Sequence, residues 1–185
     1  VENKALSIEV KNKSLEKIEN AETLSLGLRV FVDTRSACIS ISSSNKQSIE
    51  QIALRAVEMA KESTRDEYSL PATHEEISTN WDSSIFELED NNYESLNFED
   101  LKNRALEIEL AALDVKKVSQ CEGAGVGTNY SNFYMTTSGG FSGGYKKTGF
   151  QLFCSAIAGE NSLMERDYAS ESRTFFEDLP DPFSV

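Results

Sequence analysis

Apolar and polar residues alternate through the first forty residues, which is the period of a half-buried β-strand. In ALSIEV, Leu6, Ile8 and Val10 alternate with polar or small positions. Polar turn signals follow at residues 12–14 and 33–36. The three further strands that we predict cover residues 15–22, 24–32 and 37–42. Because the connections are short, we predict that the four strands form an antiparallel meander.

Two later segments carry apolar residues at helical spacing. The first follows a capping box made by Ser48 and Gln51, and the second, about residues 98–115, follows Asn97 as its cap. The apolar stripes are Ile49, Ile52, Ala53, Ala56, Met59 and Ala60 in the first, and Leu101, Ala105, Ile108, Ala112 and Val115 in the second. We expect both stripes to pack on a sheet.

Residues 65–97, between the two helices, form an acidic excursion. Residues 66–100 hold eleven Asp or Glu and no Lys or Arg, so this segment accounts for most of the net charge of −13. We predict a long surface loop with one short strand near residues 85–88. Scattered apolar residues such as Trp81 and Tyr93 indicate that the loop packs against the rest of the chain.

Strands return after residue 118. A Gly-rich segment at residues 138–150 predicts turns or bulges. In the next strand, Phe150, Leu152, Cys154 and Ala156 share one face, while Phe153 and Ile157 lie on the other, which favours cover on both sides. A turn at 159–162 leads into LMERDYASESR. The order of strands, helix, long loop, helix and strands predicts an α+β fold, with two long helices packed on an antiparallel or mixed sheet.

Charge and cysteine content narrow the classes of function. Nucleic-acid binding needs Lys and Arg that neutralise phosphates, so a net charge of −13 argues against it. No apolar run is long enough for a membrane span, and we expect no membrane association. Cys38, Cys121 and Cys154 lie among apolar or small neighbours, so we predict three buried free thiols in a reducing compartment and a cytoplasmic protein. We expect residues 1–185 to be one domain of a longer protein.

Familiar catalytic and cofactor motifs are incomplete in this chain. HEEIST at His74 lacks the second His of H-E-x-x-H, and the sequence has no other His for a zinc site. A Ser-His-Asp triad would have to recruit His74 from the acidic loop, and no Ser lies on a nucleophile elbow. GAGVGTNY has Thr128 where a dinucleotide fingerprint needs Gly, and GGFSGGYKKT departs from the P-loop pattern at Tyr145. We therefore predict no catalytic residue, no metal ligand and no cofactor within these residues.

Glu165, Arg166, Asp167 and Tyr168 form the one cluster of chemically versatile side chains. On a strand, Arg166 and Tyr168 share a face with Met164, whereas Glu165 and Asp167 share the other. Two carboxylates on one face can perform acid–base work, and a solvated face with cross-strand ion pairs is the alternative. A further hypothesis is that the cluster contacts a peptide or a partner protein.

LMERDYASESR resembles a strand in the N-terminal domain of the TldD/PmbA family, whose members are known as modulators of DNA gyrase and are related to peptidases. The match at residues 164–169 is to the PmbA (TldE) branch. Three other segments resemble family landmarks in the same order: GLRVFVDTRSACISISSSN, SIEQIALRAVEMAKESTRDEY and EGAGVGTNYSNFYMTTSGGFSGGYKKT.

The resemblance implies a role in peptide cleavage. TldD-like and TldE-like subunits form a heterodimeric peptidase that acts on peptides or unfolded proteins. Zinc is expected in the TldD-like partner, whose H-E-x-x-x-H motif lies downstream of the corresponding region. The favoured hypothesis is that this chain is the N-terminal domain of the non-metal subunit, dimeric at full length, with exposed strand edges that guide an extended peptide.

Two alternatives stay open at this point. The chain can be a stand-alone interaction domain whose acidic loop docks a basic partner. It can also belong to a peptidase that works alone.

Overall fold

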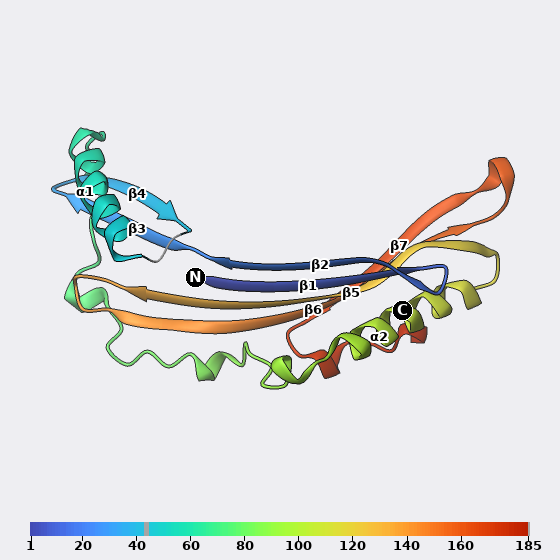
Figure 1. The fold of residues 1–185 in the computed structure, drawn as a ribbon. Helices are drawn as coiled ribbons and strands as arrows, with labels where there is room; N and C mark the ends of the chain where they lie inside the picture. The colour runs from blue at the N-terminus through green and yellow to red at the C-terminus, as the bar shows by residue number, and fades with distance from the viewer. Residues whose placement is uncertain (43–44, 185) are drawn as a thin grey trace. The chain divides into compact units, whose positions relative to one another are not determined.

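The computed structural model describes residues 1–42 and 45–184. Figure 1 shows the predicted order of strands, a helix, a long connection, a second helix and further strands, and this confirms the α+β fold class. The helices are α1 (Lys46–Glu62) and α2 (Phe98–Asp114). The strands are β1 (Glu2–Lys11), β2 (Ser14–Leu24), β3 (Leu26–Val32), β4 (Arg35–Ile41), β5 (Val118–Thr136), β6 (Ser142–Ala158) and β7 (Glu165–Arg173).

The strands form two sheets, which corrects the predicted four-stranded meander. One sheet has the order β2-β1-β5-β6-β7, and β3 pairs with β4 in a separate two-stranded sheet. The first four strands were predicted correctly, but their pairing was not. β1 lies between β2 and β5, and β2 is not paired with β3, which belongs to the other sheet. Alternation of apolar residues reveals which face of a strand is buried, and it carries no information about which strand lies beside it.

The β1–β2 connection confirms the turn predicted at residues 12–14. Asn12 and Lys13 have φ values of 53° and 59°. Positive φ at both central residues is the requirement of a type I′ turn, whose twist matches that of the flanking strands. The two-residue turn therefore makes β1 and β2 an antiparallel hairpin.

The chain divides into two compact units, each assembled from several segments. The first unit comprises Val1–Glu2, Thr23–Ser83 and Asn132–Tyr145. Within it, α1 packs on β3 and β4 and buries Ala56 and Ala60 completely. The cap of α1 is Asn45, whose Oδ1 accepts a hydrogen bond from the Ser48 backbone N–H at 2.8 Å. The predicted capping box at Ser48 is therefore wrong, because Asn45 offers a strong cap acceptor one turn earlier.

The second unit comprises Asn3–Glu22, Ser84–Ser131 and Lys146–Val185, and it holds the main core. As predicted, Asn97 caps α2, and its Oδ1 accepts from the Asp100 N–H at 3.0 Å. The predicted seam of α2 is buried at Leu101, Ala105 and Ile108 but is 58% exposed at Val115. The residues that complete the core are Ile8, Val10, Cys121, Ala124, Val126, Phe150, Leu152 and Leu179.

The excursion at residues 65–97 is a series of short 3-10 turns, at His74–Glu76, Ser84–Phe86 and Tyr93–Ser95. The strand predicted near residues 85–88 is wrong, because Glu87 has a φ of 48° and interrupts extended backbone. The prediction that the excursion packs is confirmed in each unit. In the first unit, Trp81 Nε1 donates to the Gly144 carbonyl at 2.7 Å. In the second unit, Tyr93 lies against Phe150 with ring centroids 6.1 Å apart.

Gly125 on β5 occupies a site that has no room for a side chain. A Cβ atom there would lie 2.5 Å from the Phe153 ring and would overlap the Ile8 carbonyl oxygen. We expect Gly125→Ala to lower the free energy of unfolding by about 2 kcal/mol, because the backbone of β1 must move to relieve the overlap. Urea denaturation of the full chain measures this difference.

Gly127→Ala is the matched control, two residues further along the same strand. Its added Cβ would meet only the Gln151 Cβ, at 3.9 Å, so we expect a change within about 0.5 kcal/mol. Equal stability losses in the two variants would contradict the packing argument.

Candidate functional site

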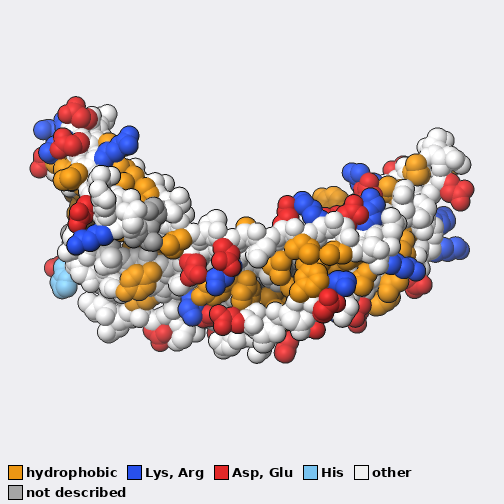
Figure 2. Space-filling model, in the orientation of Figure 1, with side chains coloured by type: hydrophobic (Ala, Val, Ile, Leu, Met, Phe, Trp, Pro, Cys, Tyr) orange, Lys and Arg blue, Asp and Glu red, His pale blue; other side chains and the backbone are white. Residues whose placement is uncertain are grey.

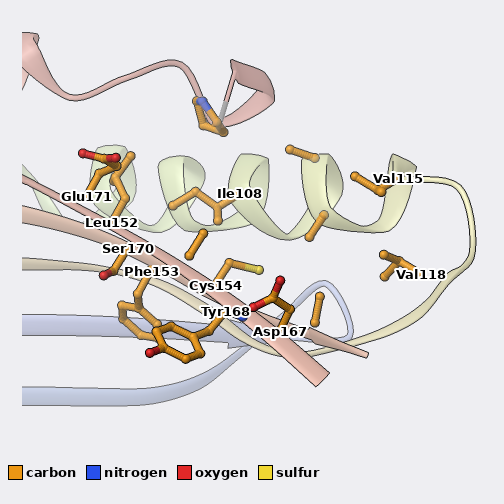
Figure 3. Close-up of a pocket in the computed structure, with 15 residues that line it drawn as sticks. Ile108, Val115, Val118, Leu152, Phe153, Cys154, Asp167, Tyr168, Ser170 and Glu171 are labelled. Carbon is orange, nitrogen blue, oxygen red and sulfur yellow. Dashed lines mark hydrogen bonds between the residues drawn. The ribbon is translucent and has the colours of Figure 1, made fainter. Parts of the chain in front are cut away.

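An open apolar groove of 320 Å³ lies in the second unit, between α2 and the strands β6 and β7. Figure 3 shows Ile108 of α2 above Leu152 and Cys154 of β6, with the Phe153 and Tyr168 rings on the far side of the strands. The lining also includes Ala111, Ala112, Val115, Val118, Ala156, Asp167, Ala169, Ser170, Glu171 and Pro182. Most of these side chains are aliphatic, so the groove suits apolar side chains of a ligand.

The pairing of β6 with β7 determines how the predicted cluster is displayed. Asp167 is opposite Ala156 and Tyr168 is opposite Ser155 in the antiparallel register. Side chains at paired positions share a face, so Asp167 lies on the face of Ala156, which lines the groove, and Tyr168 lies on the opposite face. The four residues thus do not converge on one point.

Arg166 forms a two-point ion pair with Glu122 of β5. The Arg166 Nε lies 2.6 Å from Glu122 Oε2, and its Nη2 donates to Oε1 at 2.7 Å. Ser155 Oγ also donates to Glu122 Oε2 at 3.1 Å. The hydrogen bond from Arg166 is the main reason why the pKa of Glu122 lies below its usual value, with a smaller contribution from Ser155. Arg166 therefore takes part in a cross-strand ion pair, as expected if the cluster lies on a solvated face of the sheet.

The carboxylates on the groove side are too far apart to act on one bond. Asp167 and Glu171 both line the groove, four residues apart on β7. At about 3.3 Å per strand residue they are separated by roughly 13 Å, more than the separation of a catalytic carboxylate pair. Glu171 already accepts a hydrogen bond from Arg173 Nη1 at 2.8 Å. Asp167 is therefore the carboxylate on this side that suits recognition of a positive charge on an extended ligand.

β7 is an edge strand, and this supplies the second element of the site. It pairs with β6 on one side and ends the sheet on the other. Nearly all of its residues are exposed, including Tyr168 at 78%. An exposed strand edge is a template for another extended chain.

The acidic excursion does not present all of its carboxylates to solvent. Asp90 is 5% exposed and accepts backbone hydrogen bonds, while Glu89 lies 3.4 Å from Lys146. On the face shown in Figure 2, carboxylates are interspersed with Lys and Arg. A basic partner for this segment stays a prediction.

The cysteines differ in exposure, and the prediction of three buried thiols is wrong for Cys38. Cys38 is exposed because it lies on the same face of β4 as Ser40, opposite Arg29 of β3, while Ala37, Ile39 and Ile41 on the other face are partly buried. Cys121 is buried and Cys154 is half-buried, and both thiols are free. In residues 1–42 and 45–184, no group of three or more His, Cys, Asp or Glu side chains is placed to bind a metal ion together.

Two family models match this chain. The model described as PmbA/TldA metallopeptidase domain 1 matches residues 1–60. The model described as PmbA/TldA metallopeptidase central domain matches residues 91–185, which by themselves are just over half of the chain. The chain belongs to the PmbA/TldD family. The prediction that residues 1–185 form a single N-terminal domain stays a prediction.

Three solved structures of low sequence identity share the fold. A proposed modulator of DNA gyrase from Bacteroides thetaiotaomicron aligns over 97% of this chain with a TM-score of 0.85 and 22% identity. A second proposed modulator, from Thermotoga maritima, aligns over 100% with a TM-score of 0.75 and 16% identity. TldE from Thermococcus kodakarensis aligns over 94% with a TM-score of 0.74 and 15% identity.

The present chain spans about two fifths of the length of each of these proteins, with 41%, 40% and 38% covered. No curated protein matched the sequence. Among the described residues, neither helix has the length and apolar character needed to cross a membrane.

The sequence pattern revealed part of this site. Alternation correctly separated Arg166 from Asp167, and it identified Leu152, Cys154 and Ala156 as one face of β6. Glu122 and the α2 side of the groove were missed as site residues. Glu122 precedes Arg166 by 44 positions, so only the strand order brings them together.

Proposed function

We propose that this chain belongs to the TldE-like, non-metal subunit of a two-subunit peptidase, and that the groove beside β7 holds an extended segment of the peptide substrate. Membership of a family described as metallopeptidases supports the peptidase role. The observation that carries the binding role is the apolar groove bordered by an edge strand.

The geometry favours a peptide in extended form. A peptide strand added beside β7 gains backbone hydrogen bonds that do not depend on its sequence. Its side chains alternate between the two faces of the sheet, so every second one points to the α2 side, about 7 Å from the next. The 320 Å³ groove lies on that side and is lined by Ile108, Leu152 and other aliphatic side chains.

Charge adds a preference to this binding mode. Asp167 and Glu171 border the groove on the side of β7. Glu171 is paired with Arg173, so a peptide that places apolar residues in the groove and a Lys or Arg near Asp167 forms an ion pair at its rim. We therefore propose extended peptides with alternating apolar residues and a basic residue as the preferred substrates.

In this proposal the hydrolytic chemistry comes from the partner. Zinc would be held by a TldD-like subunit and would supply the water-activating chemistry for peptide hydrolysis there. The residues of the present chain bind the peptide and orient it, and none of them takes part in the bond-breaking step.

Cleavage by the reconstituted pair tests this proposal. The full-length protein is mixed with its TldD-like partner and an extended peptide, and the rate of cleavage is compared with that of the partner alone. We expect faster cleavage in the presence of the full-length protein. The same rate with and without it would show that this protein is not a subunit of the peptidase.

A variant that fills the groove tests the binding site itself. We expect Ala169→Trp to weaken peptide binding by about tenfold, because loss of one buried aliphatic side chain of the peptide costs about 1.5 kcal/mol. Ala169 is exposed on β7 and lines the groove, so the larger side chain occupies the groove without entering the core. Fluorescence anisotropy with a labelled peptide measures the dissociation constant.

Ser172→Trp is the matched control. Ser172 is exposed on the same strand, is opposite Gln151, and does not line the groove. We expect wild-type affinity for this variant. If both tryptophan variants bind as tightly as wild type, the peptide lies elsewhere.

A further inference from the structure

Two free cysteines lie in contact beneath the groove. The Cys121 Sγ of β5 is 3.7 Å from the Cys154 Sγ of β6, and the strands are neighbours in the sheet. Cys121 also donates to the Ser155 carbonyl at 3.5 Å. A disulfide needs a Cβ–Cβ separation of about 4 Å, and residues on neighbouring strands come close to this distance when they are opposite one another. Closing the bond requires the two sulfur atoms to approach one another by rather less than 2 Å.

We propose that Cys121 and Cys154 are a redox-active dithiol that peroxide converts into an intrachain disulfide between β5 and β6. Cys154 lines the open groove, so a molecule as small as hydrogen peroxide reaches the pair from solvent. The proposal rests on the contact of the two thiols and on this access, and it does not depend on peptide binding.

The contact between the two thiols shifts their pKa values in opposite directions. The hydrogen bond donated by the Cys154 S–H lowers the pKa of Cys121, and burial of Cys121 opposes this shift. The same hydrogen bond raises the pKa of Cys154. Lys11 also lowers the pKa of Cys121, while Glu109 raises it. Cys121 is therefore the thiol that ionises first, and Cys154 is in place to resolve its oxidised form.

The reaction balances with hydrogen peroxide as the oxidant. The Cys121 thiolate attacks one oxygen, the O–O bond breaks, and a sulfenic acid and, after protonation, one water form. The Cys154 sulfur then attacks the sulfenic sulfur, the S–O bond breaks, and a second water leaves. Two thiols and one peroxide thus give one disulfide and two waters, with both sulfurs oxidised and the peroxide reduced.

Peptide mapping of the peroxide-treated, full-length protein tests the proposal. We expect the peptides that contain Cys121 and Cys154 to be recovered joined by a disulfide, with a loss of two hydrogen atoms from the intact mass. Dithiothreitol should restore both thiols. Cys38→Ser should behave like wild type, because the exposed Cys38 lies outside the pair.

A trapping variant tests the order of the two steps. In Cys154→Ser the resolving thiol is gone, so the sulfenic acid on Cys121 should persist and be labelled by dimedone. Recovery of Cys121 and Cys154 unlinked from wild-type protein, under conditions that oxidise Cys38, would overturn the proposal without any reference to peptide cleavage.

Discussion

Replacing Asp90 by alanine is expected to lower the free energy of unfolding by about 3 kcal/mol. Asp90 is 5% exposed, and its two carboxylate oxygens accept from the backbone N–H groups of Asn92 and Phe176, each at 2.9 Å. Its own N–H donates to Thr148 Oγ1 at 2.8 Å. Alanine leaves two partly buried N–H groups without acceptors, and each unsatisfied donor costs free energy because it has lost its contact with water as well.

The effect should extend beyond residue 90, because Asp90 connects three segments. Thr148 Oγ1 also donates to the Thr174 carbonyl at 2.9 Å, so the acidic segment, β6 and the chain after β7 share one network. Urea denaturation of the full chain measures the loss. Asp90→Asn retains one carbonyl acceptor and should lose less than Asp90→Ala.

Glu94→Ala is the matched control in the same acidic segment. Glu94 is exposed, so its removal should change stability by no more than about 0.5 kcal/mol. A loss at Glu94 as large as that at Asp90 would mean that segment charge, and not the hydrogen-bond network, determines stability.

The second large effect is expected at Phe150, whose replacement by alanine should cost about 4 kcal/mol. Phe150 is 1% exposed and is among the largest fully buried side chains. Its ring meets Phe176 edge-on, with centroids 5.5 Å apart and planes at 78°, and lies 6.1 Å from Tyr93. Alanine therefore leaves a cavity where β6, the acidic segment and the C-terminal segment meet.

Thermal and urea denaturation of the full chain measure this loss. Phe150→Leu, which retains much of the volume, should lose about half as much. Phe183→Ala is the exposed control, because Phe183 is 65% exposed, and it should be close to neutral. Similar losses for Phe150→Ala and Phe183→Ala would contradict the position of the core described above.

Local patterns in the sequence predicted local structure well. Alternation found all the strands of the first forty residues, and spacing by three and four found both helices. These patterns succeed because side-chain direction repeats with the backbone geometry of each element. The start of α1 was misplaced because two plausible caps, Asn45 and Ser48, lie within one turn.

Features that depend on distant residues could not be predicted. Asp90 was assigned to an acidic surface loop, but its partners Thr148 and Phe176 lie 58 and 86 positions later. Glu122 became part of the candidate site only because β6 lies between β5 and β7. Cys38 was placed in the core because its neighbours are small and apolar, although its cross-strand partner is Arg29.

The position of β1 between β2 and β5 has a consequence for biosynthesis. The ribosome completes β1 at Lys11 but does not begin β5 until Val118. At about 5–20 residues per second, the edge of β1 that β5 later covers stays unpaired for roughly 5–20 s. An apolar strand edge exposed for that time is open to mispairing with other nascent chains, so we expect this stage of synthesis to be the one at which the protein most depends on chaperones.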